Sequence, residues 1–208
     1  MPELPEVQTV VNSLVKIKDK KIYNINIHWE KVVYNSNPQY VINKIKNTKV
    51  IKIERFGKYI SIKLSKGYLV FHLRMTGYLY ASEVIPKNCK YIRCYLTFND
   101  NTFLIFEDMR KFGGFYYWNE LNILKNKLGI DPTSNRFTKN WLFFNITKRN
   151  RMIKSILLDQ SFICGLGNIY IDEILWKSKI HPTRLTSTLK KIETNSLCEN
   201  IILTFMVE

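Results

Sequence analysis

The chain has 208 residues, 46% of them hydrophobic, and its 32 Lys and Arg against 17 Asp and Glu give a formal net charge of +15. No apolar run approaches the ~18 residues that a membrane helix needs, and no basic segment followed by an apolar one marks a secretion signal. We therefore expect a soluble cytoplasmic protein rather than a membrane or secreted one. The excess of cations indicates a nucleic-acid partner; codon bias and binding to an anionic membrane surface are the alternative explanations.

The first six residues, MPELPE, place a proline directly after the initiator methionine and two carboxylates beside it. Removal of Met1, which the small Pro2 permits, would leave a secondary amine that is partly neutral and nucleophilic near a pH of about 8. Its attack on a sugar C1′ would give an iminium, so that base removal and strand cleavage share one intermediate. The alternative is structural: Pro5 and Glu6 open a helix whose apolar face is Val7, Val10, Val11 and Leu14.

Between Ile22 and about Trp118, apolar residues recur with the period of two that is typical of half-buried strands. The runs lie at residues 25–29, 50–53, 60–64, 69–73, 92–96 and 103–106. Turn-forming residues separate them at 65–67, at Asn88 and at 99–101. This half of the chain predicts an antiparallel β-sandwich with the N-terminal helix on its flank.

After a polar connector at residues 129–135, the periodicity becomes helical. Helices are expected around Trp141 and Ile153, and segments 169–176 and 189–205 also suit helices. The predicted fold class is α+β, with a catalytic β-sandwich domain at 1–130 and a helical DNA-binding domain at 131–208. A basic cleft between two such lobes would accommodate a duplex.

The cysteines show neither a C-x-x-C pair nor a regular spacing; they are Cys89, Cys94, Cys164 and Cys198. This pattern gives little support to a four-thiolate zinc site, and disulfides are not expected in a reducing cytosol. We expect free buried thiols and no metal site.

Two short motifs in the predicted sheet carry residues that could contact DNA. Lys58 follows a glycine turn in FGKY, where its ammonium could reach a phosphate or a proton-transfer position; a solvated surface lysine is the alternative. In HLRMTG, strand alternation sends His72 and Arg74 to one face and Met75 to the other. Met75 would then be either core filling or an apolar wedge.

Two loops are further candidates. DMRKFGG crowds cations, an aromatic residue and a Gly-Gly pair after an apolar strand, so Arg110 and Phe112 could fill the gap left by an extruded nucleotide. A solvated basic hairpin tip is the alternative. In GLGN, Asn168 falls at the expected N-cap of a helix, where its amide and the free backbone N–H groups could hold a phosphate.

In this order, the motifs PELPEV, GKY, HLRMTG, DMRKFGG and LLDQSFICGLGNIYIDEILWKSKIHP resemble those of the formamidopyrimidine-DNA glycosylases, and the resemblance extends across essentially the whole chain. It implies a base-excision repair enzyme that removes 8-oxoguanine and formamidopyrimidines. It also implies AP lyase activity, in which a Schiff base at an N-terminal proline leads to β,δ-elimination. The expected partner is double-stranded DNA with damaged bases or abasic sites, bound by a nucleoid-associated monomer that needs no cofactor.

The resemblance implies catalytic roles at four positions. Pro2 would be the nucleophile, and Glu3 would protonate the sugar oxygen. Glu6 would act as a supporting second carboxylate. Lys58 would contact phosphate near the lesion and assist excision.

The resemblance also implies phosphate contacts. His72 and Asn168 resemble phosphate ligands, and Lys154 resembles an electrostatic helper. Segment 159–182 is similar to the family's helix–two-turn–helix element.

A group of three residues resembles the trio that fills the void left by a flipped base. They are Met75, Arg110 and Phe112, with Arg110 facing the orphaned cytosine. Leu4 favours this branch over the endonuclease VIII branch, which usually has glycine there and prefers oxidised pyrimidines.

One departure concerns the C-terminus. Family members normally continue into a zinc finger of four cysteines, whereas this sequence ends at FMVE. Without the finger, DNA binding should weaken and its salt dependence should flatten, because fewer counterions are released. The alternative function is therefore a catalytically impaired protein that binds damaged or abasic DNA, and a pyrimidine-directed glycosylase is a third hypothesis.

Overall fold

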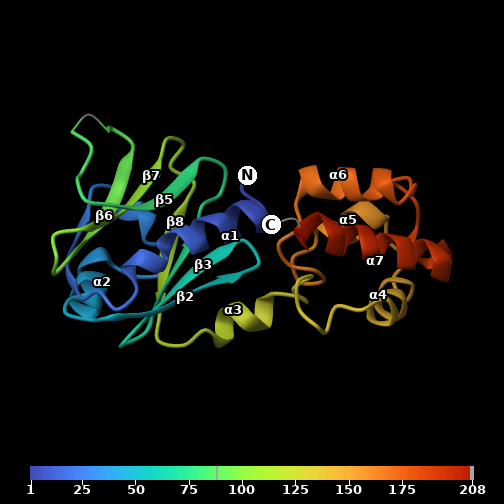
Figure 1. The fold of residues 1–208 in the computed structure, drawn as a ribbon, viewed down its shortest axis with the longest axis horizontal. Helices are drawn as coiled ribbons and strands as arrows, with labels where there is room; N and C mark the ends of the chain where they lie inside the picture. Colours follow the sequence, from blue (N-terminus) through green and yellow to red (C-terminus); the bar gives the residue numbers. More distant parts are fainter. Residues whose placement is uncertain (88, 207–208) are drawn as a thin grey trace. The chain divides into compact units, whose positions relative to one another are not determined.

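The computed structural model describes residues 1–87 and 89–206 and comprises two units, Met1–Ile123 and Leu124–Glu208 (Figure 1). Asn88, which was expected to lie in a turn, is outside the described residues. No helix within the described ranges is long and apolar enough to cross a membrane.

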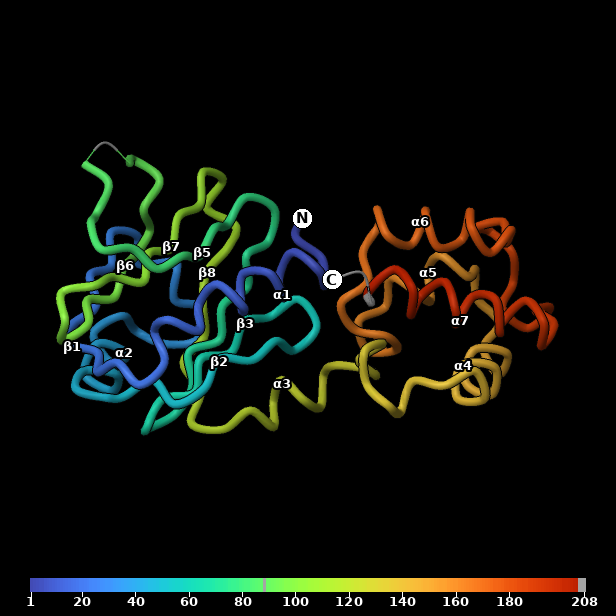
Figure 2. Tube along the Cα trace, in the orientation of Figure 1, coloured from blue at the N-terminus to red at the C-terminus, as the bar shows by residue number. Residues whose placement is uncertain are grey.

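The first unit is a β-sandwich, in which the described residues form two antiparallel sheets of four strands each. The strand orders are β1-β6-β7-β5 and β2-β3-β4-β8. The strands are β1 Ile22–Ile27, β2 Val50–Phe56, β3 Tyr59–Leu64, β4 Tyr68–His72, β5 Gly77–Ser82, β6 Ile92–Phe98, β7 Phe103–Asp108 and β8 Gly114–Trp118. β4 and β8 are far apart in sequence but pair antiparallel. The trace shows another pair of this sheet, β2 and β3, side by side (Figure 2).

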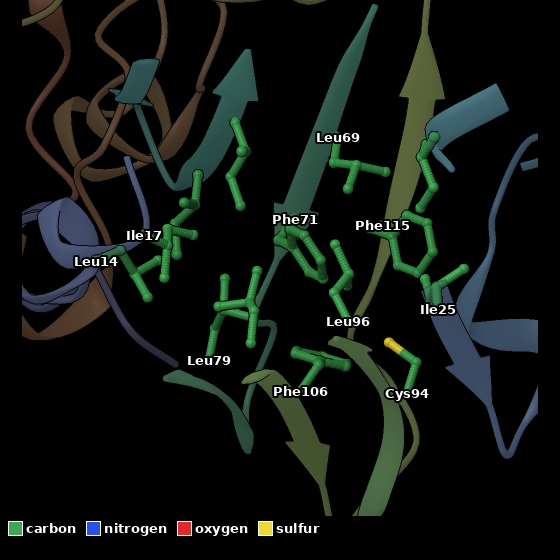
Figure 3. Packing of buried hydrophobic residues seen from close by; sticks show 14 of the residues in the cluster. Leu14, Ile17, Ile25, Leu69, Phe71, Leu79, Cys94, Leu96, Phe106 and Phe115 are labelled. Atoms are coloured by element: carbon green, nitrogen blue, oxygen red, sulfur yellow. The ribbon is translucent and has the colours of Figure 1, made fainter. Parts of the chain in front are cut away.

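Alternate side chains of the two sheets fill the space between them (Figure 3). The centroid of the Phe71 ring lies 5.0 Å from that of Phe115 in its own sheet and 5.7 Å from that of Phe106 in the other sheet. All three rings are almost completely buried. These aromatic contacts therefore tie the two sheets together.

Helix α1, Leu4–Ser13, covers one side of the sandwich and buries Val7 and Val11, as its apolar spacing predicted. Leu14 is also buried but belongs to the following 3-10 turn, η1 Leu14–Ile17. A further 3-10 turn, η2, spans Glu30–Val32.

Four elements were not predicted: α2 Pro38–Ile45, α3 Asn122–Lys127, β5 and β8. In β5 the alternation of apolar and polar residues is hidden, because the aromatic Tyr78 is 57% exposed while its neighbour Leu79 is buried. Helix α2 is short, and only two of its residues, Val41 and Ile45, are buried.

The second unit is helical, and its helices are α4 Lys139–Ile146, α5 Ile153–Leu158, α6 Asn168–Lys177 and α7 Lys191–Met206, with a 3-10 turn, η3, at Thr186–Thr188. Its separate core includes Leu142, Leu157, Ile171 and Leu197, none of which is exposed. α5 and α6 are joined by the turns of residues 159–167. The predicted α+β class, with a sandwich followed by a helical part, is confirmed.

The two-turn link between α5 and α6 is held by side-chain hydrogen bonds to the backbone. The Gln160 amide donates to the Leu166 carbonyl oxygen at 2.8 Å and accepts from the Gly165 N–H at 2.9 Å. Gly165 has a φ of 95°, a conformation that glycine adopts without strain. These contacts fix the start of α6.

Candidate functional site

The start of α1 is built by the acidic residues of MPELPE. Glu3 is the N-cap, and the Glu6 carboxylate accepts a hydrogen bond from its N–H at 2.8 Å. The Glu3 carboxylate accepts from the Glu6 N–H in return, which completes a capping box. Glu3 is only 3% exposed, Glu6 is exposed, and Pro2 is half-buried immediately before the cap. The same residues therefore build the helix and hold a buried carboxylate beside Pro2.

Lys58 lies in the tight turn between β2 and β3. Phe56 pairs with Tyr59 across this turn, and Gly57 takes a φ of 55°. Lys58 is only 6% exposed, so its interpretation as a solvated surface lysine is wrong. Burial lowers the pKa of Lys58, while the negative charge of Glu3 acts in the opposite direction. The fold thus brings Lys58 close enough to Glu3 for their charges to interact.

His72 ends β4 as a buried, neutral imidazole. Its Nδ1 accepts a hydrogen bond from the Arg74 N–H at 3.0 Å, which leaves the ring proton on Nε2. Burial, followed by the positive charges of Arg74 and Lys58, lowers the pKa of His72 to about 3. The His72 and Tyr59 rings pack in a T-shaped arrangement, with their centroids 4.6 Å apart. His72 can therefore donate one hydrogen bond at neutral pH without carrying a charge.

Met75 lies in one loop and Arg110 and Phe112 lie in another, and the Arg110 side chain contacts both of the others. Arg110 Nη1 donates to Met75 Sδ at 3.1 Å, and the guanidinium lies 4.6 Å from the centroid of the Phe112 ring. Met75 and Phe112 are each 50% exposed, so the core-filling interpretation of Met75 is wrong. β4 ends at His72 and Arg74 takes a φ of 54°, so strand alternation no longer applies at Met75.

Tyr34 connects these loops, and no sequence motif pointed to it. Its hydroxyl donates to the Phe112 carbonyl oxygen at 2.7 Å, and the Arg74 side chain also hydrogen-bonds to it. A Cβ at Gly114 would lie 2.3 Å from the Val32 carbonyl oxygen. The Gly-Gly pair of DMRKFGG thus signalled a close backbone approach, but only the fold reveals which segment approaches it.

Lys154 and Asn168 belong to the second unit, whereas the other eight predicted site residues belong to the first. Lys154 Nζ pairs with Asp172 Oδ1 at 2.6 Å, which holds the ammonium beside the first turns of α6. Gly167 is the N-cap of α6, so the expectation that Asn168 would cap it is wrong by one residue. Asn168 is instead the first helical residue, exposed where backbone N–H groups lack intrahelical partners.

The cysteines do not cluster with other possible metal ligands in the part of the chain that the structure describes. Among the described residues, no group of three or more His, Cys, Asp or Glu could hold a metal ion. None of the four cysteines forms a disulfide; Cys94, Cys164 and Cys198 are buried, and Cys89 is half-buried. Burial raises the pKa of Cys198 to about 11, which keeps it protonated. These residues do not fit the four-cysteine zinc site that is usual in the family, and no chemical step depends on such a site.

Family models match most of the chain. The N-terminal domain of formamidopyrimidine-DNA glycosylase matches residues 1–115. The H2TH domain of formamidopyrimidine-DNA glycosylase matches residues 128–207. The two matches follow the order in which the sandwich and the helical unit occur.

Individual relatives agree with these matches. The formamidopyrimidine-DNA glycosylase of Mycoplasma genitalium is 39% identical over 96% of this chain and 72% of its own length. That of Lactobacillus gasseri is 37% identical over 97% of this chain and 75% of its own length. The crystal structure of the Lactococcus lactis enzyme, non-covalently bound to DNA containing an AP site, is 32% identical with a TM-score of 0.90, and the match covers 98% of this chain and 80% of that one. The chain therefore belongs to the formamidopyrimidine-DNA glycosylase family of DNA-repair glycosylases.

Proposed function

We propose that the chain removes oxidised purines, 8-oxoguanine and formamidopyrimidines, from double-stranded DNA and then cleaves the resulting abasic site. One observation carries this proposal: Pro2 directly precedes a buried carboxylate, Glu3, which interacts with a buried cation, Lys58. Buried ionisable groups of opposite charge are typical of active sites. The family membership and the net charge of +15 support the same reaction.

In the proposed reaction, removal of Met1 frees the Pro2 nitrogen, whose lone pair attacks C1′ of the damaged nucleotide. The glycosidic bond breaks and its electron pair leaves with the base, which takes a proton from water, while the Pro2 nitrogen loses its N–H proton to the Glu3 carboxylate. Glu3 gives this proton to O4′ as the C1′–O4′ bond opens, which leaves a cationic iminium between Pro2 and C1′. The iminium accepts the electrons released by loss of a C2′ proton. β-Elimination then expels the 3′ phosphate, δ-elimination expels the 5′ phosphate, and water hydrolyses the adduct to restore Pro2.

The remaining predicted residues would bind the DNA. His72 would donate its Nε2–H to a phosphate, because that nitrogen carries the ring proton. Lys154 and Asn168 would hold a second phosphate at the N-terminus of α6. Structural relatives support this class of partner, since one is a complex of a Lactococcus lactis mutant with DNA containing Fapy-dG, with a TM-score of 0.91.

The proposed chemistry requires no redox or nucleotide cofactor, because Pro2 and Glu3 supply the nucleophile and the proton. The direct test is borohydride trapping with a duplex that carries 8-oxoguanine opposite cytosine. Reduction of the iminium should give a covalent protein–DNA complex. Protein that retains Met1, identified by its intact mass, is the matched negative control because its Pro2 nitrogen is an amide.

Two substitutions sharpen this test. Glu3→Gln should reduce trapping and excision, since it removes the proposed proton donor while preserving side-chain volume. Glu30→Gln makes the same chemical change at an exposed position of the 3-10 turn η2 and should have no effect. Absence of an adduct with both lesion-bearing and abasic duplexes would reject the proposal. Lesion-selective binding without an adduct would instead support the alternative of a catalytically impaired binding protein, and preference for thymine glycol would support the pyrimidine-directed alternative.

A further inference from the structure

A single carboxylate organises both loops that carry Met75, Arg110 and Phe112. Asp108 is the last residue of β7 and is completely buried. Its Oδ1 accepts hydrogen bonds from the Thr76 hydroxyl and, at 3.1 Å, from the Arg110 N–H. Asp108 therefore connects the residue after Met75 to the start of the 109–113 loop.

The other carboxylate oxygen holds the far end of the same loop. Asp108 Oδ2 accepts from the Phe112 N–H at 2.7 Å and from the Gly113 N–H at 2.6 Å. The Asp108 backbone is itself fixed, because its carbonyl oxygen accepts from Arg93 Nε at 2.7 Å and its N–H donates to the Tyr91 carbonyl at 2.9 Å. Backbone N–H groups on both sides of Lys111 thus converge on one immobile side chain.

This arrangement needs an aspartate in particular. A carboxylate accepts hydrogen bonds at both oxygens, whereas an asparagine of the same shape replaces one oxygen with an N–H donor. At Asp108 that donor would face either the Phe112 and Gly113 N–H groups or the Arg110 N–H and the Thr76 hydroxyl. A buried donor that faces other donors is costly and pushes the loop away.

We infer that Asp108 is a positioning residue that presets the Met75, Arg110 and Phe112 side chains as one rigid wedge before DNA binds. This inference rests on the proposed function, in which that trio fills the space of an extruded base. All three side chains are exposed, yet the Arg110 and Phe112 backbones donate to the same buried carboxylate. The hydroxyl of Thr76, the residue after Met75, donates to it as well, and the Arg110 side chain contacts both Met75 and Phe112. Such preorganisation removes the cost of ordering the loops during base extrusion.

The test compares Asp108→Asn with Asp100→Asn. Asp100 precedes the start of the same strand, β7, and its carboxylate likewise accepts from a backbone N–H and a hydroxyl, both of Thr102. Both substitutions remove one negative charge. Asp100 lies at the opposite end of the strand from the wedge, so its variant controls for the charge change and for strand β7 itself.

The first readout is the ratio of two activities. Excision of 8-oxoguanine requires a stacked base to be displaced, whereas cleavage at a preformed abasic site does not, so misplacement of the wedge should affect excision more. For Asp108→Asn we expect excision to fall about 10- to 100-fold and abasic-site cleavage to fall less than about 3-fold. Asp100→Asn should leave both unchanged. Equal losses in both activities, or no loss in either, would overturn the inference.

The second readout does not depend on chemistry, and so separates this inference from the proposed function. A duplex carries a tetrahydrofuran abasic analogue next to 2-aminopurine, whose fluorescence rises when an inserted side chain unstacks it. Wild-type protein and Asp100→Asn should raise the fluorescence at saturation, and Asp108→Asn should not. Equal fluorescence for all three proteins would refute the wedge role of Asp108 even if the enzyme were inactive.

A milder variant covers the case in which Asp108→Asn does not fold. Thr76→Val removes one donor to Asp108 and one of the two acceptors of the Arg110 N–H, and it retains the hydrogen bonds of Asp108 with the loop N–H groups. It should shift the activity ratio and the fluorescence in the same direction by a smaller factor. A folded Thr76→Val protein with wild-type values in both assays would contradict the inference.

Discussion

The neutral state of His72 makes the stability of the sandwich depend on pH in a predictable way. The folded ring takes up a proton only near a pKa of about 3, whereas a histidine in the unfolded chain does so near ~6.5. Between these values only the unfolded chain binds the proton, so falling pH favours unfolding. The contribution of His72 is fully present above pH ~6.5 and is lost as the pH falls toward the folded pKa.

The magnitude follows from these two pKa values. From about pH 7 to about pH 5, His72 alone should lower the free energy of unfolding by about 2 kcal/mol. Urea denaturation of wild-type protein and His72→Asn at the two pH values measures this, because the asparagine cannot titrate but can still accept from the Arg74 N–H. His28→Asn, at an exposed position of the same unit, is the control and should behave as wild type. An equal loss of stability in wild type and His72→Asn would refute the assignment of a buried neutral ring.

Three further predictions concern DNA binding, catalysis and packing. His72→Asn should weaken DNA binding without changing its salt dependence, since a neutral donor releases no counterion. Lys154→Gln should instead reduce the slope of log K against log [salt] by about 0.9. Fluorescence-anisotropy titrations at several salt concentrations measure both slopes, and equal slopes for the two variants would contradict the prediction. Burial lowers the pKa of Lys58, so the excision rate of the wild type should decline with rising pH below the pKa of an ordinary lysine. Lys58→Met should remove this alkaline decline from the single-turnover pH profile. A decline that persists in the variant would assign it to another group. Gly129→Ala should cost roughly 1–3 kcal/mol, because its Cβ would lie 2.2 Å from the Phe162 carbonyl oxygen, and thermal unfolding should show this loss.

Much of the fold was predictable because its patterns are local. The apolar spacing of Val7 and Val11 predicted the buried face of α1, and alternation predicted β3 and β7. The capping box at Glu3 and Glu6 is also a local pattern, formed by residues three apart. Interactions of this kind depend on neighbours along the chain, so sequence spacing is enough to reveal them.

The predictions that failed depended on where a chain reversal occurs. Met75 was assigned a face by strand alternation, but the strand stops at His72 and the backbone turns through a positive φ at Arg74. Asn168 was one residue from the true cap, because Gly167 takes the extended conformation that a cap needs. Element ends are decided by competition between local and tertiary hydrogen bonds, which spacing does not record.

The sequence by itself determined the fold class, the positive charge and the family, since composition, periodicity and ordered motifs require no coordinates. Only the tertiary structure showed that Lys58 is buried beside Glu3, that His72 is neutral, and that Asp108 holds the loop of Arg110 and Phe112. Burial and pKa depend on groups that folding brings from distant parts of the chain. A lysine, a histidine and an aspartate thus acquire their chemical character from neighbours that only the folded chain supplies.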